Sequence, residues 1–153
     1  NEVGELFSTS PYLFNGYWKR PDETKEALVD GWLTVGDMAR QDEDGYLYIV
    51  DRKTDMVISG GVNIYPREIE DVLHNHPNIQ DVAVIGVPDE KWGESLKAFI
   101  VTHHPDALKS EEVLSFCEQN ISKIKTPKII EFIDTIPRNA NGKVLKTTLR
   151  KNS

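Results

Sequence analysis

The apolar and polar positions of the first fifty residues come in short alternating runs. These runs predict three short strands, at residues 4–9, 32–35 and 46–50. Dipeptides such as Asp30-Gly31 mark turns, and residues 36–50 are typical of a hairpin whose tip lies at 42–45. Pro21 opens a segment with acids in its first turn, which favours a short helix. Each strand holds few apolar residues, so we expect this region not to form a complete core alone.

The apolar runs become longer after residue 52. The spacing of Ile69, Val72 and Leu73 predicts a helix that runs from Pro66 to His74. Further strands are predicted at 55–59, 79–88, 96–104 and 128–134, and further helices at 110–120 and 143–151. We expect the first of these strands to pair back on the strand before it, and Ser110 to cap its helix. This order of elements predicts an α+β fold, in which a small, mostly antiparallel β-sheet carries flanking helices.

Composition and charge narrow the class of protein. With 153 residues, of which 39% are hydrophobic and 28% charged, the chain has the composition of an ordinary globular protein. No apolar run approaches the roughly 18 residues of a membrane span, and the N-terminal residues show no signal peptide. The single cysteine, Cys117, fits a reducing compartment, so we expect a cytoplasmic protein. A net charge of −7 disfavours a large nucleic-acid surface.

The charge is distributed unevenly along the chain. Residues 123–153 hold 8 Lys and Arg against 2 Asp and Glu, a local charge of +6. Such a segment could attract an anionic ligand, although a solvated helix face is the simpler interpretation. The histidine pairs at 74 and 76 and at 103 and 104 lack Cys or Asp partners at ligand spacing, so no metal site is expected.

Gly60 and Gly61 stand side by side between a predicted strand and a predicted helix. Glycine costs backbone entropy, so such a pair indicates either a positive φ or a close approach by another group. The phosphate-loop patterns GxGxxG and GxxxxGK[ST] are absent here. Asn63 also stands where the GxxG loop of a KH module needs its second glycine. Taken alone, the two glycines indicate a tight turn.

Three polar or aromatic residues stand out in turns. Asn141-Gly142 predicts a turn that places Lys143 at the head of a helix, where its charge opposes the helix dipole. Such a cation either is a solvated surface lysine or serves a reacting centre of negative charge. Asp37 follows a short strand and a glycine, which alone indicates a turn. Trp92 lies in a loop between strands, where an indole usually packs but could also stack on a base.

Six signatures occur in series along the chain: GEL, YW followed by P, W-x-x-x-GD, DR-x-x-DMVISGG-x-N-x-x-P-x-EIE, PD-x-x-WGE and PR-x-x-x-GK. Together they resemble the C-terminal part of an AMP-forming acyl-CoA synthetase, over essentially the whole chain. This adenylate-forming superfamily also includes the adenylation domains of peptide synthetases and luciferase. The resemblance implies that an acid reacts with ATP to give an acyl-adenylate and pyrophosphate, and that CoA then gives acyl-CoA and AMP. A fatty acid is the expected substrate, with aromatic acids next.

The resemblance also implies a domain organisation. Residues 1–50 correspond to the end of a large N-terminal adenylating domain, 51–55 to a hinge, and 56–153 to a mobile C-terminal lid domain. The expected partners are a small-molecule acid, ATP, CoA and the missing N-terminal domain. Mg²⁺ is expected to accompany ATP but not to be bound by this segment. No Ser/Thr/Gly-rich phosphate loop ending in PKG and no acid pocket is visible, so we expect the chain alone to be inactive.

The resemblance assigns roles for the nucleotide and the reaction. Asp37 would accept hydrogen bonds from the ribose hydroxyls of ATP, and Arg52 would contact ribose or phosphate. Lys143 would be the adenylation lysine, which neutralises charge as the acyl-phosphate bond forms. The hinge would comprise Lys53, Thr54 and Asp55.

A second set of roles concerns CoA. The segment Ser59-Gly60-Gly61 would line the pantetheine tunnel, where a side chain would block a narrow channel, and Trp92 would lie near the CoA nucleotide. Ile124 and Thr126 stand where some relatives have an aromatic residue and an arginine. The local cations that remain for the CoA phosphate are Lys123, Lys125 and Lys128, with Lys125 the central candidate.

Two alternatives remain open at this stage. An adenylation unit that loads a carrier protein would present its phosphopantetheine to the same glycine strand. A stand-alone, non-catalytic binding module could also retain the lid fold, although residues 1–50 would then have no evident purpose.

Overall fold

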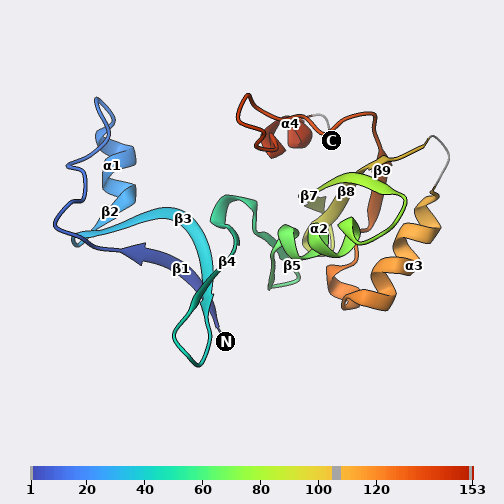
Figure 1. Cartoon of the computed structure of the whole chain (residues 1–153), viewed down its shortest axis with the longest axis horizontal. Helices are drawn as coiled ribbons and strands as arrows, with labels where there is room; N and C mark the ends of the chain where they lie inside the picture. The colour runs from blue at the N-terminus through green and yellow to red at the C-terminus, as the bar shows by residue number, and fades with distance from the viewer. Residues whose placement is uncertain (1, 105–107, 152) are drawn as a thin grey trace. The chain divides into compact units, whose positions relative to one another are not determined.

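The computed structural model describes residues 2–104, 108–151 and 153. The chain divides into two compact units, Asn1–Thr54 and Asp55–Ser153, which we call the N-terminal and C-terminal units. Figure 1 follows them from blue through green to red. The division falls within the predicted hinge range 51–55. The assignment of these units to the domains of a larger enzyme stays a prediction.

The N-terminal unit contains a four-stranded antiparallel sheet and one short helix. Its elements are β1 (Val3–Ser8), α1 (Pro21–Ala27), β2 (Leu28–Val29), β3 (Trp32–Gln41) and β4 (Leu47–Arg52). The β3–β4 hairpin confirms the prediction, because the N–H of Gly45 donates to Asp42 O at 3.1 Å at its tip. β3 is longer than predicted, since it pairs with β1 on one edge and β4 on the other. Asp37 therefore lies within a strand, not after one.

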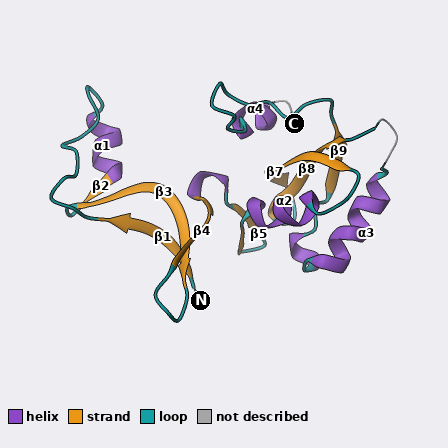
Figure 2. Cartoon of the chain, viewed as in Figure 1, coloured by secondary structure: helices purple, strands orange, loops and turns teal. Residues whose placement is uncertain are grey.

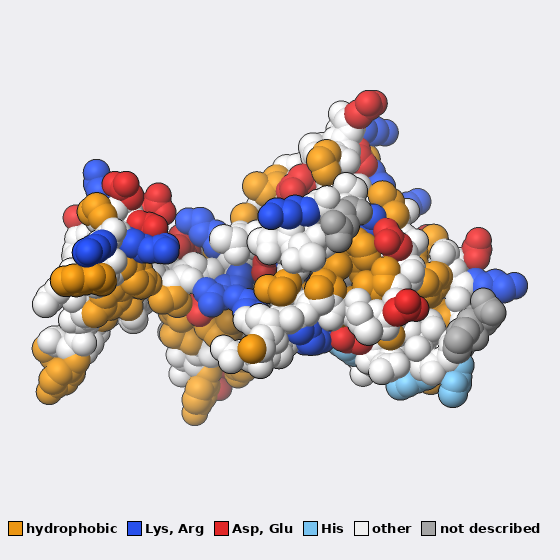
Figure 3. Space-filling model, turned by 90° about the horizontal axis from the view of Figure 1, so that it is seen from above, with side chains coloured by type: hydrophobic (Ala, Val, Ile, Leu, Met, Phe, Trp, Pro, Cys, Tyr) orange, Lys and Arg blue, Asp and Glu red, His pale blue; other side chains and the backbone are white. Residues whose placement is uncertain are grey.

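Few side chains of the N-terminal unit are buried. Among its described residues these are Thr34, Met38, Ala39 and Asp51. Many large apolar side chains are exposed instead, and Figure 3 shows them gathered at the left of the view. They include Phe7, Tyr12, Phe14, Tyr17, Trp18, Trp32, Tyr46, Leu47, Tyr48 and Ile49. So many exposed apolar side chains are typical of a surface that another part of a protein covers. The small number of buried residues agrees with the expectation that this region does not form a complete core alone.

The C-terminal unit contains a five-stranded sheet with helices around it (Figure 2). Its strands are β5 (Val57–Ser59), β6 (Val62–Ile64), β7 (Ile79–Asp89), β8 (Gly93–Thr102) and β9 (Ile129–Phe132). Its helices are α2 (Pro66–His74), α3 (Ser110–Asn120) and α4 (Lys146–Lys151). The strand order is β6-β5-β8-β7, and β9 pairs with β8 in parallel, whereas the other pairs are antiparallel. Short 3₁₀ turns occur at η1 (Lys53–Asp55) and η2 (Lys123–Lys125).

Alternating side chains of β7 supply two hydrophobic clusters, one on each face of the sheet. Val82 and Val84 pack in a cluster with residues of α2 and α3, including Leu73 and Val113. Residues 83, 85 and 87 pack in a second cluster with Leu149 of α4. Helices thus cover both faces of a mostly antiparallel sheet, which confirms the predicted α+β fold.

Three local predictions for this unit were wrong. The strand expected at 55–59 pairs with β6 and β8, not with β4, because the η1 turn separates it from the preceding strand. Ser110 does not cap α3 but begins it. The preceding residue, Lys109, donates its N–H to Glu112 Oε2 at 2.9 Å. The last helix begins at Lys146, three residues later than predicted, because residues 137–145 form a hydrogen-bonded turn of their own.

Candidate functional site

Asp37 and Arg52, the two candidate nucleotide-binding residues, face each other across β3 and β4. Arg52 Nε lies 3.1 Å from Asp37 Oδ1, and Arg52 Nη1 donates to Val35 O at 2.6 Å. Both side chains remain partly exposed, at 43% for the arginine and 26% for the aspartate. The cross-strand register therefore places an oriented carboxylate and a guanidinium together on one accessible surface.

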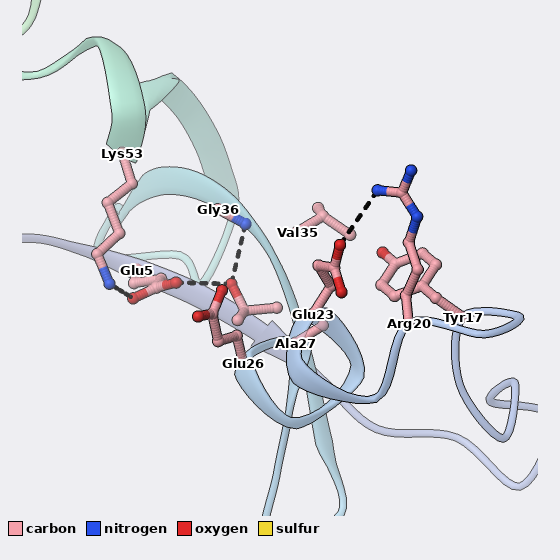
Figure 4. A pocket seen from close by; sticks show the side chains of 10 residues that line it. Glu5, Tyr17, Arg20, Glu23, Glu26, Ala27, Val35, Gly36 and Lys53 are labelled. Atoms are coloured by element: carbon pink, nitrogen blue, oxygen red, sulfur yellow. Dashed lines mark hydrogen bonds and ion pairs between the residues drawn. The ribbon is translucent and has the colours of Figure 1, made fainter.

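An open pocket of about 460 Å³ lies beside α1 in the N-terminal unit (Figure 4). Lys53 Nζ lies 2.7 Å from Glu5 Oε2, and Thr34 Oγ1 donates to the other oxygen of that carboxylate at 2.8 Å. The hydrogen bond from Lys53, followed by that from Thr34, lowers the pKa of Glu5 below its ordinary value. Arg20 and Glu23 form another ion pair at the rim. Asp37 and Arg52 do not line this pocket.

The predicted hinge residues form the η1 turn, and the units divide between Thr54 and Asp55. Lys53 is paired with Glu5 of β1 in its own unit. Asp55 Oδ1 lies 2.9 Å from Arg150 Nη2 of α4, within the C-terminal unit. The residues on either side of Thr54 are therefore anchored in different units.

The two adjacent glycines form the turn of the β5–β6 hairpin, in which Ser59 pairs with Val62. Their φ values are +57° and +81°, as in the type I′ turns that favour glycine. The tight-turn interpretation is confirmed, but the turn joins two strands and not a strand and a helix. β6 escaped prediction because it has only three residues, two of them exposed.

Trp92 packs against this turn through both its backbone and its ring. Its carbonyl accepts the N–H of Gly60 at 2.9 Å, and its ring lies so near that a Cβ on Gly60 would come within 2.6 Å of Cε3. A Cβ on Gly61 would meet nothing within 4 Å. Positive φ therefore explains both glycines, and a close approach explains the first in addition.

A larger pocket, of about 810 Å³, lies beside Trp92 in the C-terminal unit, and we call it the Trp92 pocket. It is lined by Ser59, Trp92, Ser95, Leu96, Leu114, Glu118, Lys123, Ile124, Thr126, Pro127 and Lys128. Most of its wall is apolar, with two lysines and one glutamate as its charged groups. Thr126 Oγ1 is buried and has no hydrogen-bond partner among the described residues. The walls come from segments far apart in sequence, so Leu114 and Glu118 on α3 had no sequence signal.

The cations near this pocket differ in their availability. Lys128 Nζ donates to Asp89 Oδ2 at 2.6 Å, and this bond, together with N–H donors from Trp92 and Lys91, lowers the pKa of Asp89 to about 2. Lys125, the predicted CoA ligand, does not line the pocket, because its ammonium is paired with both oxygens of Glu68 at 2.7 and 2.8 Å. Lys123 lines the pocket and forms no ion pair with any described residue.

Lys143 lies in the turn before α4, not at the head of a helix as predicted. Its charge therefore does not oppose a helix dipole. Its side chain is exposed, and within the described part of the chain its ammonium has no acidic partner. The turn thus offers a free cation on a fixed backbone.

The basic segment 123–153 is largely neutralised by the rest of the C-terminal unit. Five of its eight cations are paired with carboxylates: Lys125–Glu68, Lys128–Asp89, Arg138–Asp81, Lys146–Glu70 and Arg150–Asp55. Among residues 2–104, 108–151 and 153, no group of three or more His, Cys, Asp or Glu could hold a metal ion. Within the same ranges no helix is long and apolar enough to cross a bilayer.

Comparison with known proteins links this arrangement to one family. Residues 68–143 match the AMP-binding enzyme C-terminal domain. Over 97% of its own length, the chain is 46% identical to a long-chain-fatty-acid–CoA ligase of Escherichia coli O157:H7. Over 99% of its own length, it is 44% identical to a 2-succinylbenzoate–CoA ligase of Bacillus cytotoxicus. These matches cover 26% and 31% of the two ligases, so the chain spans less than a third of such relatives.

Solved structures also match the chain over almost its whole length. ATP-bound MatB from Rhodopseudomonas palustris superposes with a TM-score of 0.91 at 38% identity, covering 99% of this chain and 30% of that one. A Mycobacterium tuberculosis fatty acyl CoA synthetase gives 0.71 at 44% identity, covering 98% and 30%.

Proposed function

The chain belongs to the AMP-binding enzyme C-terminal domain family, and from this premise we propose that it is the C-terminal portion of an ATP-dependent acid–CoA ligase. The acid carboxylate would attack the α-phosphorus of ATP and release pyrophosphate. The CoA thiolate would then attack the acyl carbon and release AMP. A long-chain fatty acid is the proposed substrate, because several relatives carry that name.

The two units would have different tasks. The N-terminal unit would complete a larger adenylating domain, which accounts for its exposed aromatic side chains and its few buried residues. Its Asp37–Arg52 pair would hold the ribose of ATP, because a carboxylate can accept hydrogen bonds from both vicinal hydroxyls. Rotation of the C-terminal unit would centre on Thr54, whose neighbours are anchored in different units.

The C-terminal unit would serve both half-reactions in turn. For adenylation it would offer Lys143, whose unpaired ammonium would neutralise the charge that develops as the acyl-phosphate bond forms. For thioester formation it would offer the backbone of the Gly60–Gly61 turn, which is open at Gly61 and covered by the Trp92 ring at Gly60, and the Trp92 pocket for the CoA nucleotide. Lys123 would attract a CoA phosphate, because it is the unpaired lysine of that pocket.

The observation that carries this proposal is the unpaired Lys143, and a half-reaction experiment on the full-length ligase tests it. ATP–pyrophosphate exchange measures adenylation, and acyl-CoA formation from preformed acyl-adenylate measures thioester formation. Lys143→Ala should lower exchange by roughly 10²–10³-fold, as the loss of a transition-state charge partner does, and should spare the second step. Lys151→Ala, which removes another exposed lysine, is the matched control. Equal losses in both steps would contradict the proposal.

A further inference from the structure

The turn that carries Lys143 is held by several hydrogen bonds between its own residues. Asn139 donates its N–H to Lys143 O at 2.9 Å, and its side-chain oxygen accepts the N–H of Lys143 at 2.9 Å. The N–H of Leu145 donates to Pro137 O at 2.8 Å and closes the base of the turn. Both polar groups of the Lys143 backbone are therefore fixed, while the side chain stays exposed.

Two ion pairs fasten this turn to the rest of the unit, one at each end. At the start of the turn, Arg138 Nη2 contacts both oxygens of Asp81 at 2.8 and 2.9 Å, while its Nη1 donates to Gly142 O at 2.9 Å. After the turn, Lys146 Nζ lies 2.8 Å from Glu70 Oε1, with both side chains less than 20% exposed. We call these four residues, Arg138, Asp81, Lys146 and Glu70, the clamp.

The clamp reaches the sheet as well. Asp81 Oδ1 accepts the N–H of Val82 at 2.9 Å, and Glu70 Oε1 accepts the N–H of Val84 at 2.8 Å. Both donors belong to β7, which ends the strand order of the sheet. Asp81 is itself part of β7 and Glu70 belongs to α2, so each carboxylate links this edge strand to one of the two clamp cations. The turn is thereby connected to β7 at both of its ends.

We propose that Arg138 and Lys146 are positioning residues for Lys143, acting through Asp81 and Glu70. This proposal rests on the proposed role of Lys143 in adenylation. A flexible lysine on a loose turn would have to be ordered at the moment of reaction, whereas the clamp orders its backbone in advance. A misplacement of about 1 Å can cost on the order of 10²-fold in rate. Arginine suits position 138 because its planar guanidinium holds two terminal nitrogens in a fixed fork, one toward Asp81 and one toward Gly142 O, whereas a lysine would offer a single ammonium nitrogen.

The test uses the full-length ligase with Arg138→Lys and Lys146→Met. Lys97→Met is the matched control, because Lys97 is 10% exposed and Lys146 11%, and each is paired with a glutamate at 2.8 Å. Both clamp variants should lower kcat of ATP–pyrophosphate exchange by roughly tenfold or more at an almost unchanged KM for ATP, the sign of an interaction used in the transition state. Thioester formation from preformed adenylate should stay near wild type, and Lys97→Met should leave exchange unchanged.

A second measurement separates positioning from general stabilisation. In the 153-residue chain, Arg138→Lys should speed amide hydrogen exchange at Lys143 while the β7–β8 amides keep wild-type protection. Lys146→Arg keeps the charge and should retain most of the exchange activity, so it covers the case in which Lys146→Met fails to fold.

The outcomes are distinguishable. If Lys143→Ala itself leaves ATP–pyrophosphate exchange intact, the proposed function fails. If Lys143→Ala abolishes exchange while both clamp variants behave like Lys97→Met, the clamp proposal fails and the proposed function stands. Loss of both half-reactions to the same extent in the clamp variants would reduce the clamp to a stabilising contact and overturn the proposal.

Discussion

The ring of Trp92 lies directly against the backbone of Gly60, although the two residues are 32 positions apart in the chain. The N–H of Gly60 donates to the carbonyl of Trp92 at 2.9 Å, so the contact is polar as well as steric. The β5–β6 turn and the β7–β8 loop therefore lie against each other beside the Trp92 pocket, which Ser59 and Trp92 both line.

This contact predicts unequal costs for two neighbouring substitutions. Gly61→Ala should destabilise the chain by about 1 kcal/mol, because alanine is strained at positive φ but meets open space there. Gly60→Ala should cost distinctly more, since its Cβ would also overlap the Trp92 ring. Urea unfolding of the two variants measures the difference. Trp92→Ala introduced into Gly60→Ala should restore part of the loss, and equal costs for the two alanines would refute the steric contact.

Much of the C-terminal unit could be predicted from sequence because its signals are local and strong. The strands β7 and β8 and the helix α2 have long apolar patterns, and each was found close to its observed bounds. β6 was missed because three residues with an exposed Asn63 give no pattern. Lys143 was misplaced because hydrogen bonds within its turn outweigh helix propensity, and a local reading of the sequence contains no information about such competition.

Some features of the candidate site could likewise be predicted from sequence, and others could not. The glycine pair, Asp37 and Arg52 were identified from motifs, but their partners depend on strand register. The pairing of Lys125 with Glu68 joins residues 57 positions apart, which no periodicity reveals. The proposal of Lys123, in place of Lys125, for the CoA phosphate therefore needed the folded structure.

That choice leads to a prediction for CoA recognition in the full-length ligase. Lys123→Ala should raise the KM for CoA several-fold, because it removes the unpaired cation of the Trp92 pocket, and the contact of such an exposed cation is worth about 1 kcal/mol. The effect should be smaller for dephospho-CoA if the contact is to the 3′-phosphate. Lys125→Ala is the matched control and should change KM less, since its ammonium is held by Glu68. A larger effect for Lys125→Ala would contradict this prediction and would indicate that Lys125 contacts the CoA phosphate.

The ion pair beneath Trp92 predicts a dependence of stability on acid. The hydrogen bond from Lys128 lowers the pKa of Asp89 from its ordinary 3.8 to about 2 in the folded chain. A lowered folded-state pKa stabilises the fold above the unfolded-state value, and this contribution disappears as pH falls through the folded-state value. Asp89→Asn should therefore lower the urea midpoint at neutral pH.

The difference in urea midpoint between wild type and Asp89→Asn should stay constant above about pH 5 and shrink between about pH 4 and pH 2, where the wild-type carboxylate takes up its proton. Glu90→Gln, on the same loop but without an ion pair among the described residues, should shift the midpoint little at any pH. Because the Lys128 side chain is 47% exposed, added salt should weaken the difference as well. A midpoint difference that is independent of pH would show that the charge of Asp89 does not contribute to stability, and would contradict the stabilising role of its pairing with Lys128.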